Sequence, residues 1–299
     1  CSFGSHTLTK KSAITGEYLD ALAREIAGAK SLTDKRNIRC VYIGGGTPTA
    51  LEAEELRRLF GILRVAYGAC VEFTVEAGRP DTINKDKLAA IRDAGATRIC
   101  VNAQTTNPET LNRIGRTYGA GEFERAFRLV REAGFDFVNT DIILGLPGET
   151  MADIQKTLED VCSFEPENVT VHTLAIKNAA NLTLEDSTQF ADAASVAAMV
   201  DWARAYLEGK GYIPYYLYRQ KYMAGNLENV GYAKPGKLCA YNIDIMEEVA
   251  DNMSFGAGAM SKRIFAAEKR IERSCNVKKV KQYIERLDEM IARKFELFG

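Results

Sequence analysis

The sequence predicts an α/β fold, a partial (β/α)6 TIM-like barrel followed by a C-terminal α+β extension. A unit of helix, Ala-Gly and apolar strand occurs twice, as KLAAIRDAGATRICVNAQ at 87–104 and AFRLVREAGFDFVNTDIILG at 126–145. Alternating strands and helices imply a parallel sheet with the helices packed outside it. Polar residues alternate with apolar ones along three successive strands, so one face of the sheet must line an interior.

The first half of the chain holds the repeated strands and helices. Apolar residues at the helical spacing i, i+3, i+4, i+7 predict a helix at 51–67, from Leu56 to Leu63, and another at 121–133, from Phe123 to Val130. Ala-Gly ends the helices of both repeats because glycine relieves the left-handed cap. The expected strands are 38–43, 71–76, 97–103, 137–144 and 168–175.

The pattern changes near residue 176, which we take as a soft boundary between a barrel at 1–176 and a substrate-covering region at 177–299. A helix is expected at 191–209, and it carries the only tryptophan, Trp202. The aromatic run YIPYYLYRQ follows, and a further strand is expected at 212–218. KRIFAAEKRIER predicts a hairpin, and a closing amphipathic helix is expected at 277–298.

Composition narrows the class of protein. Lys plus Arg number 39 against 40 for Asp plus Glu, which gives no sign of nucleic acid or an anionic membrane as partner. No apolar run approaches the roughly 20 residues of a membrane span. The seven cysteines are odd in number and form no CxxC, which favours a reducing cytoplasm over a disulfide framework. A native chain does not begin with cysteine, so we expect a segment upstream of Cys1.

Polar side chains on the predicted strands indicate a site. Burying an unpartnered polar group costs roughly 1–3 kcal/mol, so a polar ligand inside a barrel would explain them. Barrel enzymes keep their sites at the carboxyl ends of the strands. An internal hydrogen-bond network or an exposed sheet face remains the alternative. The residues concerned are Glu72, Thr74, Glu76, Asn102, Gln104, Asn139 and Asp141.

Three glycines, Gly44, Gly45 and Gly46, directly follow the first expected strand in VYIGGGTPTALEAEEL. A bare backbone lets a ligand approach, and successive N–H groups bind an anion. A tight turn is the alternative. The stretch is not GxGxxG and no GK[ST] follows, which argues against nucleotide binding. We expect Thr49 to cap the next helix, with Glu52 completing a capping box.

These motifs resemble the radical S-adenosylmethionine (SAM) enzymes of the oxygen-independent coproporphyrinogen III oxidase family. The likeness lies in IGGGTPT, VEAGRPD, VNAQTTNPETLNRIGR and NTDIILGLPGET, in that order. YYLYRQKYMAGNLENVGY and FGAGAMSKRIF resemble its coproporphyrinogen dehydrogenase branch. The family holds a 4Fe-4S cluster with a C-x3-C-x2-C motif. The opening CSFGSH makes Cys1 similar to the third of these ligands, with the other two expected upstream.

The resemblance implies the remaining site residues and names no catalytic side chain. In the family, the GGTP segment holds the methionine part of SAM, and a carboxylate on the next strand contacts SAM. The glutamine of NAQ, the arginine that ends LNRIGR and the aspartate of NTD contact a second SAM in some members. Carried over to this sequence, the cofactor-binding positions are Gly45, Gly46, Thr47, Glu76, Gln104, Arg116, Asp141, Ala175 and Met260.

The family's activity is an oxidoreductase step of haem biosynthesis. A SAM-derived 5′-deoxyadenosyl radical oxidatively decarboxylates two propionates of coproporphyrinogen III, giving protoporphyrinogen IX, and an external electron donor is required. Arg219, Lys221, Lys262 and Arg263 are candidates to bind propionates, or belong to a solvated charged edge. A haem-binding chaperone is the alternative, although the HNxxYW-like segment of that branch is absent. A radical SAM enzyme acting on another tetrapyrrole is a further alternative, in which His172 could ligate haem.

Overall fold

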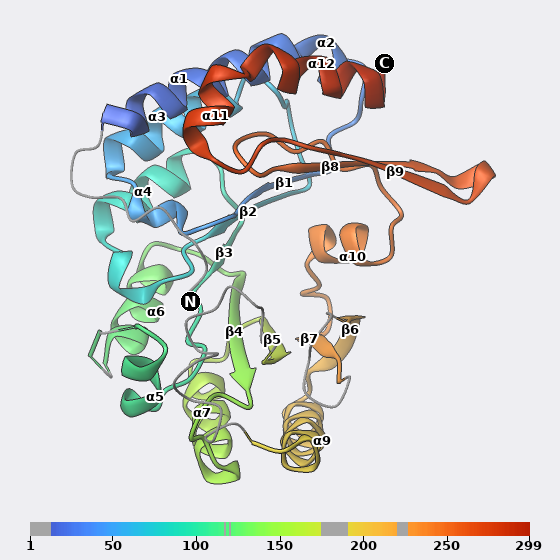
Figure 1. Cartoon of the computed structure of the whole chain (residues 1–299). Coiled ribbons are helices and arrows are strands. Elements are labelled where there is room, and N and C mark those ends of the chain that lie inside the picture. The colour runs from blue at the N-terminus through green and yellow to red at the C-terminus, as the bar shows by residue number, and fades with distance from the viewer. Residues whose placement is uncertain (1–12, 117, 120, 175–190, 220–226) are drawn as a thin grey trace.

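The computed structural model describes residues 13–116, 118–119, 121–174, 191–219 and 227–299. Its main sheet has seven strands in the order β1-β2-β3-β4-β5-β7-β6 and curls into a partial barrel (Figure 1). Strands β1 to β5 are parallel, and β7 and β6 continue the sheet in antiparallel pairs. The strands are β1 (Cys40–Ile43), β2 (Glu72–Glu76), β3 (Arg98–Cys100), β4 (Val138–Leu144), β5 (Asn168–Thr173), β6 (Ile213–Tyr218) and β7 (Asn229–Ala233).

Helices cover the outer face of the sheet (Figure 1). Apolar side chains of the helices and the outward side chains of the strands, such as Phe73, Val75 and Ile99, form the largest core cluster. The expected faces are confirmed, because α3 buries Leu56 and α6 buries Phe127. The helices of the first half are α1 (Ala13–Gly28), α2 (Lys30–Thr33), α3 (Ala53–Leu63), α4 (Lys85–Asp93), α5 (Pro108–Arg113), α6 (Glu122–Glu132) and α7 (Met151–Ser163).

Local signals for the helix ends are confirmed at two places and wrong at one. Gly95 and Gly134 have φ of +88° and +81°, as the repeated Ala-Gly cap requires. The expected cap of α3 at Thr49 is wrong, because Glu52 occupies the cap position and pairs with Glu55. Thr49 lies in a short 3-10 turn and shares a 2.6 Å hydrogen bond with the Thr82 hydroxyl.

The C-terminal part adds helices and a hairpin to the sheet. The expected hairpin is confirmed, and the expected closing helix is divided in two near Arg286. Strand β7 and helix α10 were not predicted. The expected boundary near residue 176 lies outside the described residues. The elements are α9 (Ala193–Gly209), α10 (Ala240–Met246), β8 (Met260–Phe265), β9 (Arg270–Cys275), α11 (Val280–Glu285) and α12 (Leu287–Phe298).

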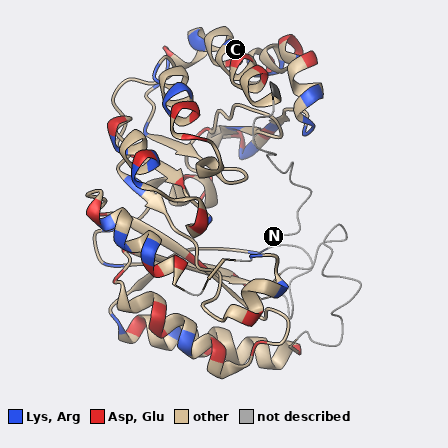
Figure 2. Cartoon of the chain, turned by 90° about the vertical axis from the view of Figure 1, so that its left-hand side faces the viewer, with Lys and Arg blue, Asp and Glu red and all other residues tan. Residues whose placement is uncertain are grey.

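The two ends of the described chain pack together. Helix α1 lies against α11 and α12 at the top of Figure 1, where Ala21 packs with Tyr283 and Met290. Acidic and basic residues are interspersed along the helices (Figure 2), in keeping with the balanced charge. Among the described helices, none combines the length and the apolar character that crossing a bilayer requires.

Candidate functional site

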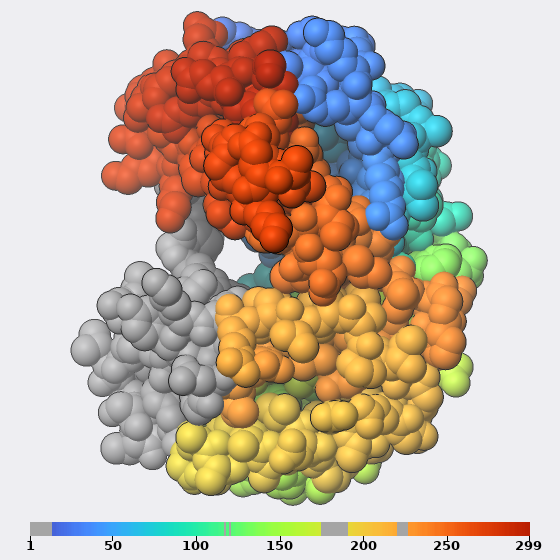
Figure 3. Space-filling model, turned by 90° about the vertical axis from the view of Figure 1, so that its right-hand side faces the viewer, coloured from blue at the N-terminus to red at the C-terminus, as the bar shows by residue number. Residues whose placement is uncertain are grey.

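The inner face of the curled sheet is polar, as the alternation of the strands predicted. The register of the parallel strands aligns Tyr42 with Thr74, Glu76 with Cys100, and Asp141 with Thr170. Neighbouring residues in register share a face, so these side chains line one surface. Figure 3 shows an opening in the molecular surface directly below the C-terminal elements that are drawn orange to red.

A row of polar groups crosses the inner face. The Tyr42 hydroxyl donates a hydrogen bond to Glu76 Oε1. His172 Nε2 lies 3.5 Å from Asp141 Oδ2, and His172 Nδ1 lies 3.2 Å from the Tyr218 hydroxyl. The row therefore joins β1 and β2 on one side with β4, β5 and β6 on the other.

Glu76 is poised to titrate near neutral pH. The pKa of its carboxyl is raised to about 7, mainly by burial and also by the charge of Asp141. Hydrogen bonds from the Tyr42 hydroxyl and the Gly45 N–H oppose this rise, as does the nearby His172. Asp141 is near enough to Glu76 to influence its charge, so the structure brings these two predicted site residues together.

The glycine corner lies beside the Glu76 carboxyl, and its three glycines differ in their surroundings. A Cβ on Gly44 would stand 2.6 Å from Tyr42 Cε1 and 3.0 Å from Glu76 Oε2, so a side chain there would collide with the pair. Gly45 has a φ of +111°, which side chains disfavour. A Cβ on Gly46 would meet nothing within 4 Å, and the φ of Gly46 is one that other residues adopt. The space beside Gly45 and Gly46 is thus open to a ligand.

Gln104 and Arg116 lie at the carboxyl end of the sheet. The Gln104 N–H donates to the Asp141 carbonyl at 2.8 Å, and Gln104 has a left-handed φ of 63°. Arg116 is buried, and its Nη1 contacts the carbonyls of Gly78 and Asn102 at 3.2 and 3.4 Å. The side-chain oxygens of Asn102 and Gln104 are buried without a hydrogen-bond partner. Unsatisfied buried oxygens at this position are what a bound polar ligand would satisfy.

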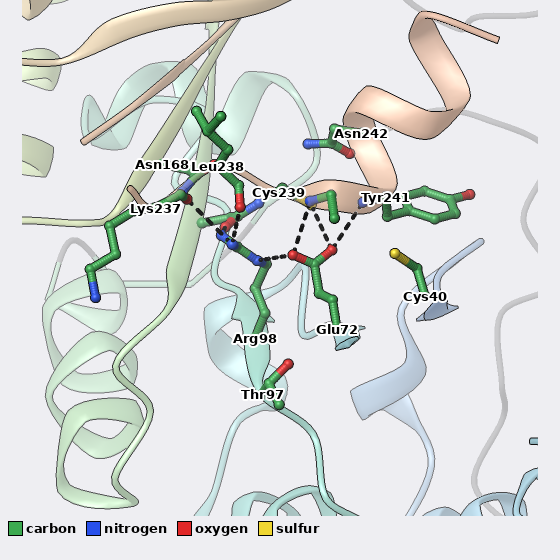
Figure 4. Close-up of polar contacts among 12 residues, drawn as sticks. Cys40, Glu72, Thr97, Arg98, Asn168, Lys237, Leu238, Cys239, Tyr241 and Asn242 are labelled. Atoms are coloured by element: carbon green, nitrogen blue, oxygen red, sulfur yellow. Dashed lines mark hydrogen bonds and ion pairs between the residues drawn. The ribbon is translucent and has the colours of Figure 1, made fainter. Parts of the chain in front are cut away.

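The opposite end of the inner face is closed by a network of hydrogen bonds (Figure 4). Glu72 accepts hydrogen bonds from Arg98 Nε and from backbone N–H groups at the start of α10. Arg98 also donates to Asn139 Oδ1 at 2.8 Å and to the Leu238 carbonyl at 2.8 Å. Glu72 and Asn139 were grouped with the site from the sequence, but they belong to an internal hydrogen-bond network, which was the alternative interpretation.

The remaining predicted residues either lie outside the described residues or have other surroundings. Cys1, Ala175 and Lys221 lie outside the described residues. Met260 begins β8 with half of its side chain exposed. The other candidate propionate-binding cations have partners, which are Glu228 for Arg219, the Ile245 carbonyl and Glu248 for Lys262, and the Leu297 carbonyl for Arg263.

Tyr42 and Tyr241 also contact this cluster, although neither was predicted as a site residue. Their rings stack with centroids 4.0 Å apart and planes inclined by 15°. Tyr42 follows the period-2 alternation of β1, with Cys40 and Gly44 on the same face, and that signal could have found it. Nothing local to α10 could have placed Tyr241 there, because the contact spans most of the chain.

Comparison with known proteins gives concordant likenesses. The profile of the Radical SAM superfamily matches residues 1–161. The oxygen-independent coproporphyrinogen-III oxidase-like protein HemZ of Bacillus subtilis is 37% identical over 99% of this chain. The chain spans 60% of the length of that relative. The heme chaperone HemW of B. subtilis is 27% identical, over 97% of this chain and 72% of its own length.

One solved structure supports the fold over almost the whole chain. The coproporphyrinogen III oxidase HemN of Escherichia coli superposes with a TM-score of 0.75, covering 95% of this chain and 64% of its own. The two sequences are 23% identical, so this likeness concerns the fold alone. The predicted partial barrel is confirmed by this match and by the curled sheet.

Proposed function

Since this chain belongs to the radical SAM superfamily, whose cofactors are SAM and a 4Fe-4S cluster, we propose that it oxidatively decarboxylates coproporphyrinogen III to protoporphyrinogen IX without oxygen. The polar row on the inner face carries this proposal. It combines the Glu76 and Asp141 carboxylates with an open glycine corner and with unpartnered amide oxygens. In this chemistry, SAM bound at the reduced cluster would supply the radical that abstracts a hydrogen atom from a propionate side chain, and an external electron acceptor would take the remaining electron as CO2 leaves.

The chain's own residues fit SAM, which carries a sulfonium and an ammonium group. Carboxylates attract such cations in a partly buried site, and Glu76 and Asp141 are placed for this. The open backbone from Gly45 to Thr47 suits the carboxylate and amino group of the methionine part. Gln104 and Arg116 offer an amide and a guanidinium at the same end of the sheet.

A tetrapyrrole would lie toward the β6 side of the inner face. Tyr216 and Tyr218 present hydroxyl groups there, the first within 3.2 Å of Thr170 Oγ1. Hydroxyl donors suit propionate oxygens better than the carboxylates on β2 and β4 do. The likeness to the HemZ relative over 99% of this chain supports the same substrate class.

Haem binding and delivery is the second candidate, favoured by the likeness to HemW. His172 is the histidine on the inner face that could ligate iron. Its two ring nitrogens lie close to Asp141 and Tyr218, so haem ligation would have to displace one of these neighbours.

An anaerobic assay distinguishes the two. The full-length protein, with its cluster reconstituted, is given SAM, a reductant and coproporphyrinogen III, and protoporphyrin is measured after oxidation of the products. We expect about two molecules of 5′-deoxyadenosine for each protoporphyrinogen, and loss of both products in Glu76→Gln. Stoichiometric haem binding in an absorbance titration, without decarboxylation, would support the chaperone function instead.

The cluster ligand is tested separately. Cys1→Ala in the full-length protein should reduce bound iron and sulfide to background after reconstitution, because three thiolates hold the cluster in the family motif. Cys275→Ala, at an exposed cysteine, is the matched control and should leave the iron content unchanged. Full iron binding by Cys1→Ala would remove Cys1 from the cluster.

A further inference from the structure

The Tyr42–Glu76 hydrogen bond fixes one side of the Glu76 carboxyl. Tyr42 on β1 reaches diagonally across to the end of β2, where its hydroxyl donates to Glu76 Oε1. Gly44 leaves the space that both groups fill. The second carboxyl oxygen faces the glycine corner, because a Cβ on Gly44 would lie 3.0 Å from Glu76 Oε2. The Tyr42 hydroxyl thus holds one oxygen, and the other lies at the glycine corner, where the Gly45 N–H also hydrogen-bonds the carboxyl.

The Tyr42 ring is itself held by a residue from the C-terminal part of the chain. Tyr241, the second residue of α10, stacks on it with the ring centroids 4.0 Å apart, and such aromatic pairs stabilise beyond the area that they bury. Without the stack, Tyr42 would be free to leave the rotamer in which its hydroxyl meets Glu76.

Helix α10 is in turn fastened to the closed end of the inner face. The N–H groups of Ala240 and Tyr241 each donate to the Glu72 carboxylate at 3.1 Å, and Cys239 Sγ lies 3.2 Å from it. Arg98, which is 2% exposed, pairs with the same carboxylate (Figure 4). Two buried charges that satisfy each other and the helix end fix the position of Tyr241 tightly.

We propose that Tyr42, clamped by Tyr241, is a positioning residue that orients the Glu76 carboxylate toward SAM. This inference rests on the proposed role of Glu76 in binding SAM and adds the device that aims it. Through Tyr241, the C-terminal part of the chain then contributes to the orientation of Glu76. The connection runs from the Glu72–Arg98 pair through α10 and the two stacked rings to Glu76.

The positioning role of Tyr42 predicts a change in the pH dependence of SAM binding. The groups that face Glu76 are Tyr42 from β1, Cys100 from β3, Asp141 from β4, His172 from β5 and Tyr241 from α10, together with the Gly45 N–H. Among them, the Tyr42 hydroxyl lowers the pKa of Glu76 by hydrogen bonding to its charged form. Removing that hydroxyl therefore raises the pKa, so that less of Glu76 is ionised at neutral pH and a cationic ligand binds more weakly.

The test is the pH dependence of SAM binding by the full-length protein carrying its cluster, measured by calorimetry between pH 6 and 9. Tyr42→Phe keeps the ring and its stack. It should weaken binding about 10-fold at pH 7, the worth of one hydrogen bond to a charged group, and by less than about 2-fold at pH 9. Tyr241→Leu should shift the profile in the same direction, whereas Tyr206→Leu, which removes a stacked ring on α9, should not.

The outcomes separate the two proposals. An unchanged profile in Tyr42→Phe, or an equal loss of affinity at every pH, would overturn the positioning role. Glu76→Gln serves as the reference, because it should abolish the pH-dependent part of binding in the wild-type and the Tyr42→Phe backgrounds. If Glu76→Gln binds SAM as the wild type does, the SAM-binding role proposed for Glu76 fails, and the positioning role fails with it.

Discussion

His172 Nε2 lies 3.5 Å from Asp141 Oδ2, across the boundary between β5 and β4. Each side chain is about a quarter exposed, so the contact lies on the inner face of the sheet and is accessible to a ligand. It joins the carboxylates of the first four strands to the tyrosines of β6. In the proposed function, the cationic cofactor and the anionic substrate meet along this line, with His172 between them.

The charge of Asp141 should control the titration of Glu76. Asp141 raises the pKa of the Glu76 carboxyl above the rise that burial produces. Asp141→Asn removes that charge, so the Glu76 pKa should fall below its value of about 7. Carbon-13 NMR of protein labelled at the glutamate carboxyls measures it, with Glu76→Gln identifying the resonance. Asp201→Asn, on the exposed face of α9, should leave the titration in place. An unmoved resonance in Asp141→Asn would contradict the coupling.

Glu149 should make the fold less stable as the pH rises. Burial raises its carboxyl pKa from 4.5 to about 7, against hydrogen bonds from Thr105 and Thr110 that lower it. The folded protein then holds a proton that the unfolded chain has lost between these two values, so stability is full below pH 4.5 and falls until about pH 7. Glu149→Gln keeps the acceptor for Thr105 and removes the titration.

The measurement is urea unfolding of wild type and Glu149→Gln at pH 5 and pH 8. The advantage of the variant should grow by on the order of 2 kcal/mol between the two conditions. Glu159→Gln, on α7, is the control, and its difference from wild type should be the same at both pH values. A constant difference for Glu149→Gln would show that Glu149 titrates normally.

The sequence was most informative where local rules decide the structure. Period-2 alternation identified the polar face of β2 and β4, and Ala-Gly identified the caps at Gly95 and Gly134. Such features depend on neighbouring residues along the chain, so a pattern predicts them well. The strand expected at 97–103 ends at Cys100 instead, and the chain rejoins β4 only at Gln104, whose left-handed φ no pattern indicated.

Long-range contacts explain what was missed. Glu72 and Glu76 alternate identically on β2, yet Glu72 binds the start of α10 while Glu76 meets Tyr42. The partner of Glu72 lies 169 residues away at Tyr241, which no alternation on β2 reveals. The alternation therefore predicted the common face of the two glutamates correctly, but it could not show that Glu72 belongs to the internal network and Glu76 to the candidate site.

Arg98 should matter more to stability than its charge alone suggests. It makes hydrogen bonds to Glu72, Asn139 and the Leu238 carbonyl in fixed directions. Arg98→Lys cannot reproduce that fork, so it should lower the free energy of unfolding by about 2–3 kcal/mol. Arg128→Lys is the matched control, because Arg128 is 65% exposed in its pair with Glu124, and it should cost less than about 0.5 kcal/mol. An equal loss of unfolding free energy in the two variants would show that the Arg98 network does not stabilise the fold.

Gly231 should tolerate no side chain, because Tyr216 fills the space beside it. On β7, a Cβ at Gly231 would stand 1.9 Å from Tyr216 Cε1, and the Tyr216 ring is itself buried against the inner face. Gly231→Ala must displace the ring, so it should lower the free energy of unfolding by about 2–3 kcal/mol, measured by denaturant titration. Gly61→Ala is the opposite case, because a Cβ in that part of α3 meets nothing within 4 Å, and alanine there should stabilise by about 0.5–1 kcal/mol. Adding Tyr216→Ala to Gly231→Ala should cost less than the sum of the two single changes, since the collision disappears with the ring. Additive costs would show that Gly231 is required for another reason.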